Sequence, residues 1–344
     1  MQSLVVGLGR AGAGLHLPVL AKARAREPQL FGGQDVVACD PCRRPPDRPG
    51  LVTTASIGSA ASGLDPAGTV VHVCTPPAQR HAVITELAEL GFRNMIVEKP
   101  LASDADDLAR IIRVRRKHRL HIEVVEPWLT STLTWRLIEL TRSGLLGAPK
   151  SITIVQNKPR FRRSLAAPGH PTAFDVELPH GVALALRLAG AARVTHAAGS
   201  DLEVDGQFSP RMGGADVGLR HISGVRTEIS SDLTSPVRER RVTVDFAHGS
   251  AVGHFAVSDD DDHSQLTVRA NGRGKHLVLR DDSLTEWMIQ AYRKFRVGGE
   301  QTRGFNFAAE VVQLLSVAKN ICAEPVVPAA RAGTGYAAVA HNAG

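Results

Sequence analysis

The 344-residue sequence has few of the features that mark disulfide-rich, membrane-spanning or nucleic-acid-binding proteins. Its four cysteines do not form a disulfide framework. No apolar run reaches the ~18 residues needed to cross a membrane. Aromatic residues make up only 4% of the chain, and no nucleic-acid-binding motif accompanies the basic residues. The first apolar run begins almost at the N-terminus, so no signal peptide is expected. These absences favour a cytoplasmic protein with reduced cysteines and no nucleic-acid or membrane partner.

No metal site is expected either. The pair Cys39-x-x-Cys42 could indicate redox or metal chemistry, but no second cysteine pair or cysteine–histidine cluster completes a site. The acidic run 259–262 could bind a cation, although a solvated turn between strands explains it more simply. The formal net charge is +7. Local clusters of arginine contribute to this charge and would attract an anionic cofactor or substrate.

A glycine-rich motif follows the apolar run Leu4–Val6 at the start of the chain. Its sequence is Gly7-Leu8-Gly9-Arg10-Ala11-Gly12. Gly7 permits a tight strand-to-helix turn, Gly9 lets the backbone approach a pyrophosphate, and Gly12 lets the helix pack closely on the strand. The N-terminus of the following helix presents free N–H groups to phosphates. The motif therefore predicts a dinucleotide site.

Further apolar runs predict the parallel strands of the same sheet. They cover residues 36–39, 69–74 and 95–97, and helical stretches alternate with them. Asp40 follows the first run, somewhat more than ~20 residues past the glycines, where a carboxylate can hold ribose hydroxyls. Thr75–Pro77 and Glu98–Pro100 follow the next two runs. Since ligands bind at the carboxyl ends of parallel strands, all these segments are expected at one edge.

This combination resembles the glucose–fructose oxidoreductase / inositol dehydrogenase family (Gfo/Idh/MocA). The matching residues are the glycine motif, Asp40, Cys74-Thr75-Pro76-Pro77 with His81, Glu98-Lys99-Pro100-Leu101 and Gly144-Leu145-Leu146-Gly147. The resemblance implies an α/β N-terminal Rossmann domain and an α+β C-terminal domain with a large, mostly antiparallel open sheet. It also implies NAD(P)-linked oxidation or reduction of sugars, cyclitols and related compounds, usually in oligomers.

Three segments are expected from the pattern and the resemblance. They are a Rossmann domain over 1–125, a substrate and oligomerisation domain over 126–325, and a C-terminal tail over 326–344. The second domain should begin with a strand at 151–156 and continue with an antiparallel meander of strands at 217–222, 228–233, 242–246, 251–257, 265–270 and 276–279. Helices are expected at 81–90, 104–117, 133–143, 182–188 and 307–321, the last returning to the Rossmann side as in the family.

The resemblance implies NAD as the cofactor, with NADP possible. The predicted cofactor-binding residues are Gly7, Gly9, Arg10, Ala11, Gly12, Asp40, Arg44, Thr75, Pro76, Pro77, His81, Glu98 and Lys99. The carboxylate of Asp40 would repel a ribose phosphate and so favours NAD. Arg43 and Arg44, just beyond it, could offset that repulsion and admit NADP.

Lys99 is the first catalytic candidate. A lysine near the reacting oxygen can donate hydrogen bonds and stabilise developing negative charge. Pro100 restricts Lys99 to an extended backbone, which would aim its side chain consistently. The family resemblance places this lysine near cofactor and substrate, whereas the alternative is a surface lysine at a strand end.

His180 is the second catalytic candidate. Many family members carry Asp-x-x-x-His here, but Val176 stands four residues before His180 in this chain. Asp175 and Glu177 flank the missing position and either could substitute, so both are catalytic candidates. A pKa near the working pH is expected for His180 as an acid/base. A helix-start histidine without a catalytic role is the alternative.

The predicted substrate-binding residues are Lys99, Trp128, Arg160, Arg163 and His180. Trp128 could stack on an apolar sugar face or belong to the core. The segment 158–163 would suit an anionic group such as a phosphate, or could be a solvated loop.

The resulting hypothesis is an NAD(P)-dependent dehydrogenase or reductase acting on the secondary alcohol or ketone of a sugar, amino sugar or cyclitol. It would be a homo-oligomer, dimer or tetramer, with a small-molecule substrate. One alternative is a reductase of an imine or cyclic ketone in a biosynthetic pathway. Another is a cofactor-binding regulator without turnover. The intact Glu98-Lys99-Pro100 favours an enzyme, and the altered acids around His180 leave the regulator open.

Overall fold

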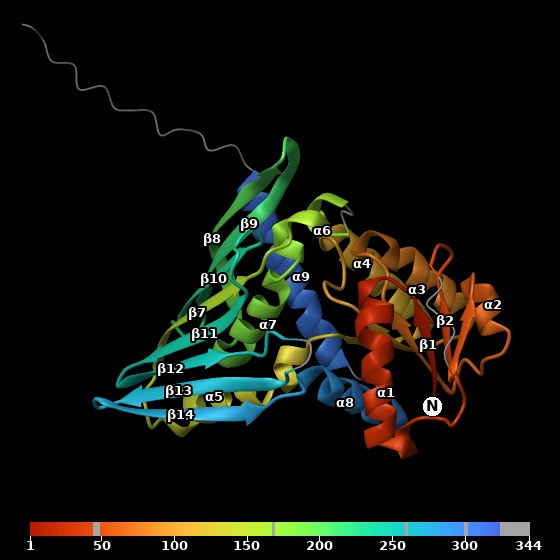
Figure 1. Cartoon of the computed structure of the whole chain (residues 1–344), viewed down its shortest axis with the longest axis horizontal. Helices are drawn as coiled ribbons and strands as arrows, with labels where there is room; N and C mark the ends of the chain where they lie inside the picture. The colour runs from red at the N-terminus through yellow and green to blue at the C-terminus, as the bar shows by residue number, and fades with distance from the viewer. Residues whose placement is uncertain (44–48, 167–168, 259–260, 299–301, 324–344) are drawn as a thin grey trace, which may run out of the picture.

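The computed structural model describes residues 1–43, 49–166, 169–258, 261–298 and 302–323, which form two sheets with helices between and around them (Figure 1). The predicted tail over 326–344 therefore lies outside the described residues. The first sheet is parallel and has six strands in the order β3-β2-β1-β4-β5-β6. Their bounds are β1 Gln2–Val6, β2 Val36–Cys39, β3 Leu51–Thr54, β4 Thr69–Val73, β5 Asn94–Val97 and β6 His121–Val124. The order reverses between β1 and β4, which is the point where doubly wound sheets bind their ligands.

Helices connect the strands of this sheet. They are η1 Gly12–His16, α1 Leu17–Arg26, η2 Pro28–Leu30, α2 Ile57–Ala61, η3 Pro77–Gln79, α3 Arg80–Glu89 and α4 Ala105–His118. The strands β4 and β5 are buried along their whole length, as expected for a sheet covered on both faces. Asp104 caps α4 by accepting a hydrogen bond from the Asp107 backbone N–H, and the basic last turn of the helix complements its dipole.

The second sheet has eight strands in the order β14-β13-β12-β11-β7-β10-β9-β8. Their bounds are β7 Pro149–Asn157, β8 Ala192–Val204, β9 Gln207–His221, β10 Arg226–Asp232, β11 Glu239–Phe246, β12 Gly249–His254, β13 His263–Ala270 and β14 Arg273–Arg280. Neighbouring strands are antiparallel except β7 and β10, which run parallel. The expected fold class is confirmed, although β7 lies inside the sheet and so interrupts a simple meander.

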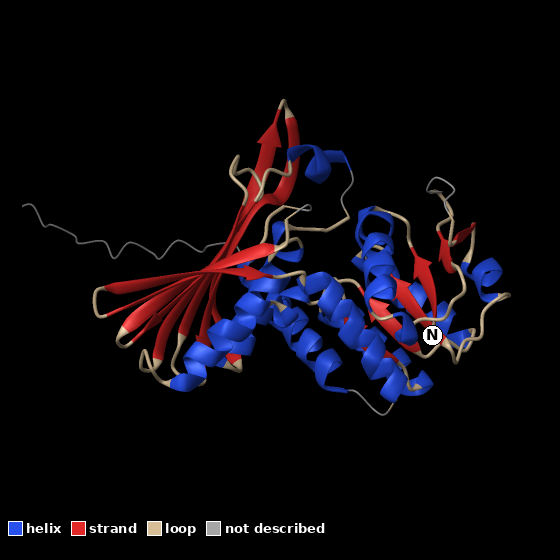
Figure 2. Ribbon diagram, turned by 60° about the horizontal axis from the view of Figure 1, so that its bottom comes forward, coloured by secondary structure: helices blue, strands red, loops and turns tan. Residues whose placement is uncertain are grey.

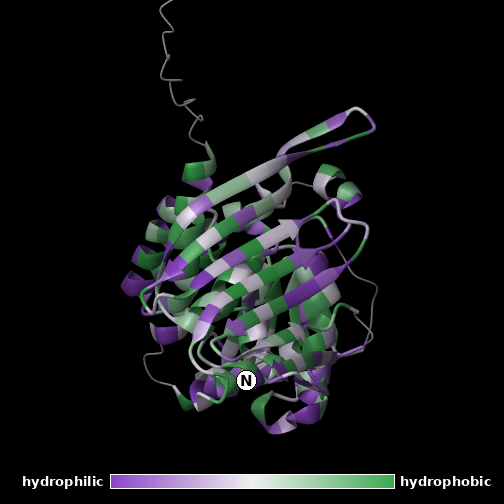
Figure 3. Cartoon of the chain, turned by 90° about the vertical axis from the view of Figure 1, so that its left-hand side faces the viewer, coloured by the Kyte–Doolittle hydropathy of each residue, from purple (hydrophilic) through white to green (hydrophobic). Residues whose placement is uncertain are grey.

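Helices gather on one side of this second sheet (Figure 2). They are η4 Pro127–Thr130, α5 Thr132–Ser143, α6 Phe161–Ala166, η5 Ala173–Asp175, α7 Leu178–Ala189, α8 Ser283–Val297 and α9 Thr302–Ala323. The apolar face of α7 packs on β7 and β10 around Ile154, Leu184 and Ile229. Figure 3 views the opposite face of the sheet, where apolar and polar residues alternate along the strands.

The last two helices join the two units. Helix α9 packs on β8 and α7 of the second unit and on β6 and α4 of the first. Helix α8 packs on α1 and on η4. Phe305 and Val312 of α9 belong to the core of the parallel sheet, and Val311 and Leu315 belong to the core of the second sheet. Helix α9 thus contributes to both cores, and a cavity lined by residues of both units lies between them.

Several elements were missed by the sequence analysis. Strand β8 is mostly exposed and rich in small residues, so its apolar residues do not alternate. Strand β3 and helix α2 are only four and five residues long. Helix α8 is amphipathic but stands directly after the hairpin of β13 and β14, where the pattern of short strands dominated the prediction.

Candidate active site

A cavity of about 1420 Å³ lies at the carboxyl ends of the parallel strands and extends to the second unit. Single small-molecule sites measure roughly 300–1,000 Å³, so this cavity has room for more than one small ligand. Predicted cofactor residues that line it are Gly7, Gly9, Arg10, Ala11, Asp40, Thr75, Pro76, Pro77, Glu98 and Lys99. The predicted substrate residues Trp128, Arg160, Arg163 and His180 line the same cavity. The structure therefore brings both sets together.

The glycine motif forms the expected close turn. Gly7 has φ of 92°, and a Cβ there would lie 3.1 Å from the backbone of Cys74. A Cβ on Gly12 would lie 1.9 Å from the Gly7 carbonyl oxygen, so no larger residue fits without moving the turn. Gly12 packs against the backbone of the turn and does not line the cavity. The helix after it begins with a π-helical turn, η1, before α1 continues as an α-helix.

Asp40 supports the glycine motif directly. Its Oδ2 accepts a hydrogen bond from the Leu8 N–H at 2.7 Å, and its Oδ1 accepts from the N–H groups of Cys42 and Arg43. Each carboxylate oxygen has further acceptor capacity, so a ribose hydroxyl could still donate to it. Arg43 reaches back over Gly9, where its Nη1 would lie 3.6 Å from an added Cβ. Arg44, the other arginine of the cofactor prediction, lies outside the described residues.

His81 was predicted to bind the cofactor, and the structure places Arg80 in that position instead. Arg80 lines the cavity and is 2% exposed, whereas the cavity wall does not include His81. Consecutive helical residues point in directions about 100° apart, so only one of the two can face the cavity. Arg80 donates to the carbonyl oxygens of Thr75 and Lys99, and its Nη1 has no hydrogen-bond partner among the described residues. The Oγ1 of Thr75 is likewise buried and unpaired there, as expected of groups that contact a ligand.

Lys99 lies at the end of β5 with its Nζ donating to the Val176 carbonyl oxygen at 2.5 Å. This bond crosses from the parallel sheet to the second unit. Burial lowers the pKa of Lys99, while the carboxylates of Glu98 and Glu126 raise it in part. The ammonium group is therefore easier to deprotonate than that of a surface lysine.

The carboxylate beside His180 comes from neither of the predicted acids. Glu126, two residues after β6, places its Oε2 3.3 Å from His180 Nδ1. Asp175 instead accepts from Thr172 and pairs with Lys319, and Glu177 pairs with Lys158. The prediction that Asp175 or Glu177 partners His180 is therefore wrong.

The physical reason is that Asp175 ends the short helix η5 and caps it through Thr172, which turns its carboxylate away from His180. Glu126 replaces the missing acid from a different strand. Burial raises the pKa of Glu126, and Glu98 raises it further, while Lys99 opposes the shift. The one sequence signal for this residue is a carboxylate two positions after a buried strand.

His180 is held as a neutral imidazole. Burial and the cations Lys99, Arg240 and Lys158 lower its pKa well below the ordinary value. The expectation of a pKa near the working pH is therefore wrong for the protein without ligands. Its ring stacks on Trp128 at a centroid distance of 5.6 Å, and Trp128 stacks on Phe255 at 4.0 Å. Trp128 is 5% exposed, so it is a core residue that also forms part of the cavity wall.

A buried chain of hydrogen bonds leads away from the cavity beneath the glycine motif. His16, in the π-helical turn, contacts Glu98 Oε1 through Nε2 and His72 Nδ1 through its own Nδ1, both at 2.9 Å. His72 Nε2 contacts the Tyr292 hydroxyl at 2.8 Å, and that hydroxyl contacts Ser3. Burial alone would lower the pKa of His16, but Cys74 and Glu98 raise it to about 10. No sequence pattern predicts this chain of hydrogen bonds, because its members are far apart in sequence.

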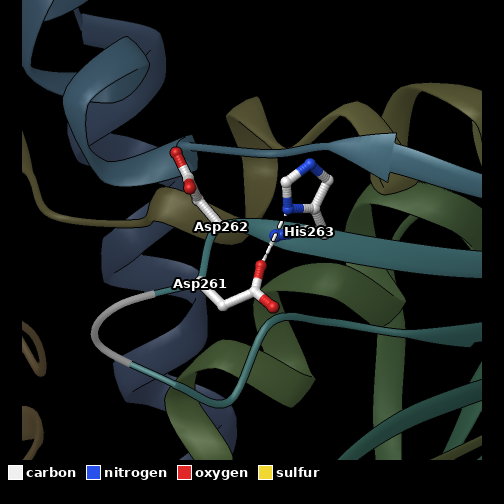
Figure 4. A group of neighbouring side chains, drawn as sticks. All are labelled: Asp261, Asp262 and His263. Atoms are coloured by element: carbon white, nitrogen blue, oxygen red, sulfur yellow. Dashed lines mark hydrogen bonds and ion pairs between the residues drawn. The ribbon is translucent and has the colours of Figure 1, made fainter.

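The acidic turn considered for a cation is only partly described. Asp261, Asp262 and His263 lie close enough together to share an ion (Figure 4). The Oδ1 of Asp261 accepts hydrogen bonds from the backbone N–H and the ring Nδ1 of His263. The three residues are exposed or half-buried, and these contacts are those of an ordinary turn before a strand.

The six-stranded parallel sheet, the glycine-rich turn and the cavity at the strand ends are the features of a dinucleotide-binding Rossmann unit, here joined to a second unit. Residues 1–125 match the model of the family GFO_IDH_MocA, described as "Oxidoreductase family, NAD-binding Rossmann fold". The resemblance found in the sequence is thus confirmed over these residues, and binding of NAD(P) is supported. A search of curated proteins found no match.

Solved structures share the whole fold at low sequence identity. KijD10, a 3-ketoreductase from Actinomadura kijaniata in complex with NADP and TDP-benzene, is 15% identical, with a TM-score of 0.80 over 94% of this chain and 98% of that one. An oxidoreductase from Thermotoga maritima is 16% identical, with a TM-score of 0.72 over 92% of this chain and 95% of that one. At such identities the similarity establishes the fold alone. No helix in the described ranges is long and apolar enough to span a membrane.

Proposed function

We propose that the protein interconverts a secondary alcohol and a ketone on a polyhydroxylated small molecule, such as a sugar, an amino sugar or a cyclitol. The observation that carries this proposal is that Lys99 and His180, from different units, line the same cavity as the glycine motif. A bound nicotinamide would accept or supply the hydride. Gly7, Gly9 and Asp40 would hold the dinucleotide at the strand ends.

Lys99 would act at the reacting oxygen. Its Nζ is held by the Val176 carbonyl, so the amine has a fixed position while its remaining hydrogens stay available. An ammonium group in a buried site stabilises developing alkoxide charge strongly, because little water competes with it. The neighbouring carboxylates Glu98 and Glu126 oppose the effect of burial and so favour the charged form of Lys99.

His180 would exchange the hydroxyl proton, with Glu126 as its positioning partner. When Glu126 is ionised, it accepts a hydrogen bond from His180 Nδ1–H, and Nε2 is left with a free lone pair. That tautomer is the base that alcohol oxidation requires. When Glu126 is protonated, it donates to Nδ1, and the proton on Nε2 is then available to the oxygen of a ketone. Glu126 thus selects the tautomer of His180.

The proposal is tested by turnover. The purified protein is given NAD or NADP with a panel of sugars, amino sugars and cyclitols, and reduced nicotinamide is followed by its absorbance. The Lys99→Ala variant is measured beside it and should bind the cofactor while its turnover falls by roughly 100-fold or more. Cofactor binding by the wild type with no turnover of any alcohol or corresponding ketone would contradict the proposal and favour a regulator.

A further inference from the structure

One part of the cavity wall in the second unit carries a cluster of positive charge. Lys158, Arg160 and Arg163 line it, and Arg10 faces them from the glycine motif. These cations are close enough to affect one another: burial lowers the pKa of Arg160 to about 10, and Arg163 and Arg10 contribute to the shift. Burial and Arg10 also lower the pKa of Arg163. Mutual repulsion of this kind is unfavourable unless a negative charge enters the cavity.

The carboxylates of the cavity wall do not neutralise the three arginines. Glu177 pairs with Lys158, Glu98 pairs with His16, and the Asp40 carboxylate accepts hydrogen bonds from backbone N–H groups. Within the described ranges, no aspartate or glutamate forms an ion pair with Arg10, Arg160 or Arg163. The positive charge of these three guanidinium groups is therefore uncompensated in the protein without ligands.

The Arg160 side chain is buried in the wall of the cavity. Its side chain is 6% exposed, its Nη1 donates to Ser164 Oγ, and its Nε has no partner among the described residues. His170 beside it also has an unpaired buried Nδ1. Burial and the cations Lys99, Arg160, Arg80 and Lys158 lower the pKa of His170 to about 2, so this imidazole is neutral and can donate or accept a hydrogen bond. Buried guanidinium N–H groups without a partner are rare, and they point to a ligand that supplies oxygens.

We propose that Arg160 and Arg163, with Arg10 opposite them, form a subsite for a phosphoryl group carried by the substrate. Several guanidinium groups around one space suit an anion with three oxygens and more than one charge, since each can donate two parallel N–H bonds. The substrate would then be a phosphate or diphosphate ester of the polyhydroxylated compound. This inference rests on the proposed function, because it assigns a substituent to that substrate.

Two observations place the phosphoryl group on the substrate side of the cavity. The phosphates of the cofactor would accept hydrogen bonds from the backbone N–H groups that follow Gly7 and Gly9, so they do not need these arginines. Arg160, in contrast, lies beside Lys158 and His170, and both of these residues are close enough to Lys99 for its charge to lower their pKa values. The phosphoryl group of a substrate bound there would lie on the side of the cavity that holds Lys99.

Binding of inorganic pyrophosphate and phosphate to the NAD-saturated protein tests this subsite without any turnover. Calorimetric titration should show binding in the wild type. In Arg160→Gln and Arg163→Gln the dissociation constant should rise about tenfold or more, the effect of losing a charge-assisted hydrogen bond. Arg163 is exposed, so its variant should fold even if Arg160→Gln does not. Arg193→Gln, on the exposed side of β8, removes the same charge and should bind as the wild type does.

Three results would overturn the inference. They are absence of binding in the NAD-saturated wild type, pyrophosphate binding that NAD abolishes by competition, and equal affinity in both cavity variants and the wild type. Competition with NAD would assign the arginines to the cofactor. The proposed function fails separately, by absence of turnover in a protein that still binds pyrophosphate through Arg160 and Arg163.

Discussion

The pH dependence of alcohol oxidation should report Glu126 rather than His180. Burial raises the pKa of Glu126 and lowers that of His180 well below its ordinary value, so Glu126 is the group that titrates toward the neutral range. Ionised Glu126 leaves His180 Nε2 free as a base. The rate of oxidation should therefore rise with pH as Glu126 loses its proton, and ketone reduction should show the opposite dependence.

The informative variant is Glu126→Gln, which keeps the shape of the side chain and removes its titration. A positioned acid/base contributes roughly 100- to 10,000-fold. The Oε2–Nδ1 distance of 3.3 Å is slightly beyond the usual hydrogen-bond range, which favours the lower end. We therefore expect kcat/KM for oxidation to fall about 100-fold on the alkaline side of the titration, and the rising limb to disappear.

The variant should also affect Lys99. Because Glu126 raises the pKa of Lys99, its removal lowers that pKa, and the loss of rate at high pH should begin at lower pH. Initial rates measured across the pH range with saturating NAD give both the rising limb and the loss of rate at high pH. Asp175→Asn and Glu177→Gln, measured alongside, should keep the rising limb, since their carboxylates contact other residues. An unchanged profile and rate in Glu126→Gln would refute this role for Glu126.

Three further changes test other parts of the site. Lys99→Ala should lower kcat by roughly 100-fold or more with little change in the dissociation constant of NAD, and a normal rate would exclude it from the mechanism. Asp40→Ala should weaken NAD binding about tenfold, and tighter binding of NADP than NAD by the wild type would contradict the predicted preference. Gly12→Ala should cost about 1–3 kcal/mol of stability in thermal unfolding, since its Cβ would lie 1.9 Å from the Gly7 oxygen, and an unchanged Tm would show that the turn can relax.

The parts of the fold that the sequence predicted depend on local patterns. Buried runs of β-branched residues marked β1, β4 and β5, and the glycine motif marked the first turn, because each is decided by neighbours along the chain. The convergence of Asp40 and Lys99 on one cavity followed from a general rule, since parallel strands carry their ends to one edge. These features needed no knowledge of how the two units pack.

The contacts that define the chemistry depend on packing across the chain. His180 meets Glu126 from 54 residues away, and Lys99 meets Val176 from 77 residues away. From the sequence alone, Asp175 and Glu177 were the candidates for the carboxylate that contacts His180, because they flank the position of the missing acid. The pairing of each carboxylate was decided by the caps and cations around it, which are visible only in three dimensions.

The buried His16 connects cofactor binding to the charge of Lys99. Burial alone would raise the pKa of Glu98, but the hydrogen bond from His16 and the charges of Lys99 and Arg80 lower it overall. Among the groups that raise the pKa of Lys99, the ionised Glu98 carboxylate has the largest effect. His16 stands in the π-helical turn that follows the glycine motif, so the backbone that would hold the dinucleotide also fixes this imidazole. A change that straightens this turn should therefore affect the ionisation of Lys99 as well as the affinity for cofactor.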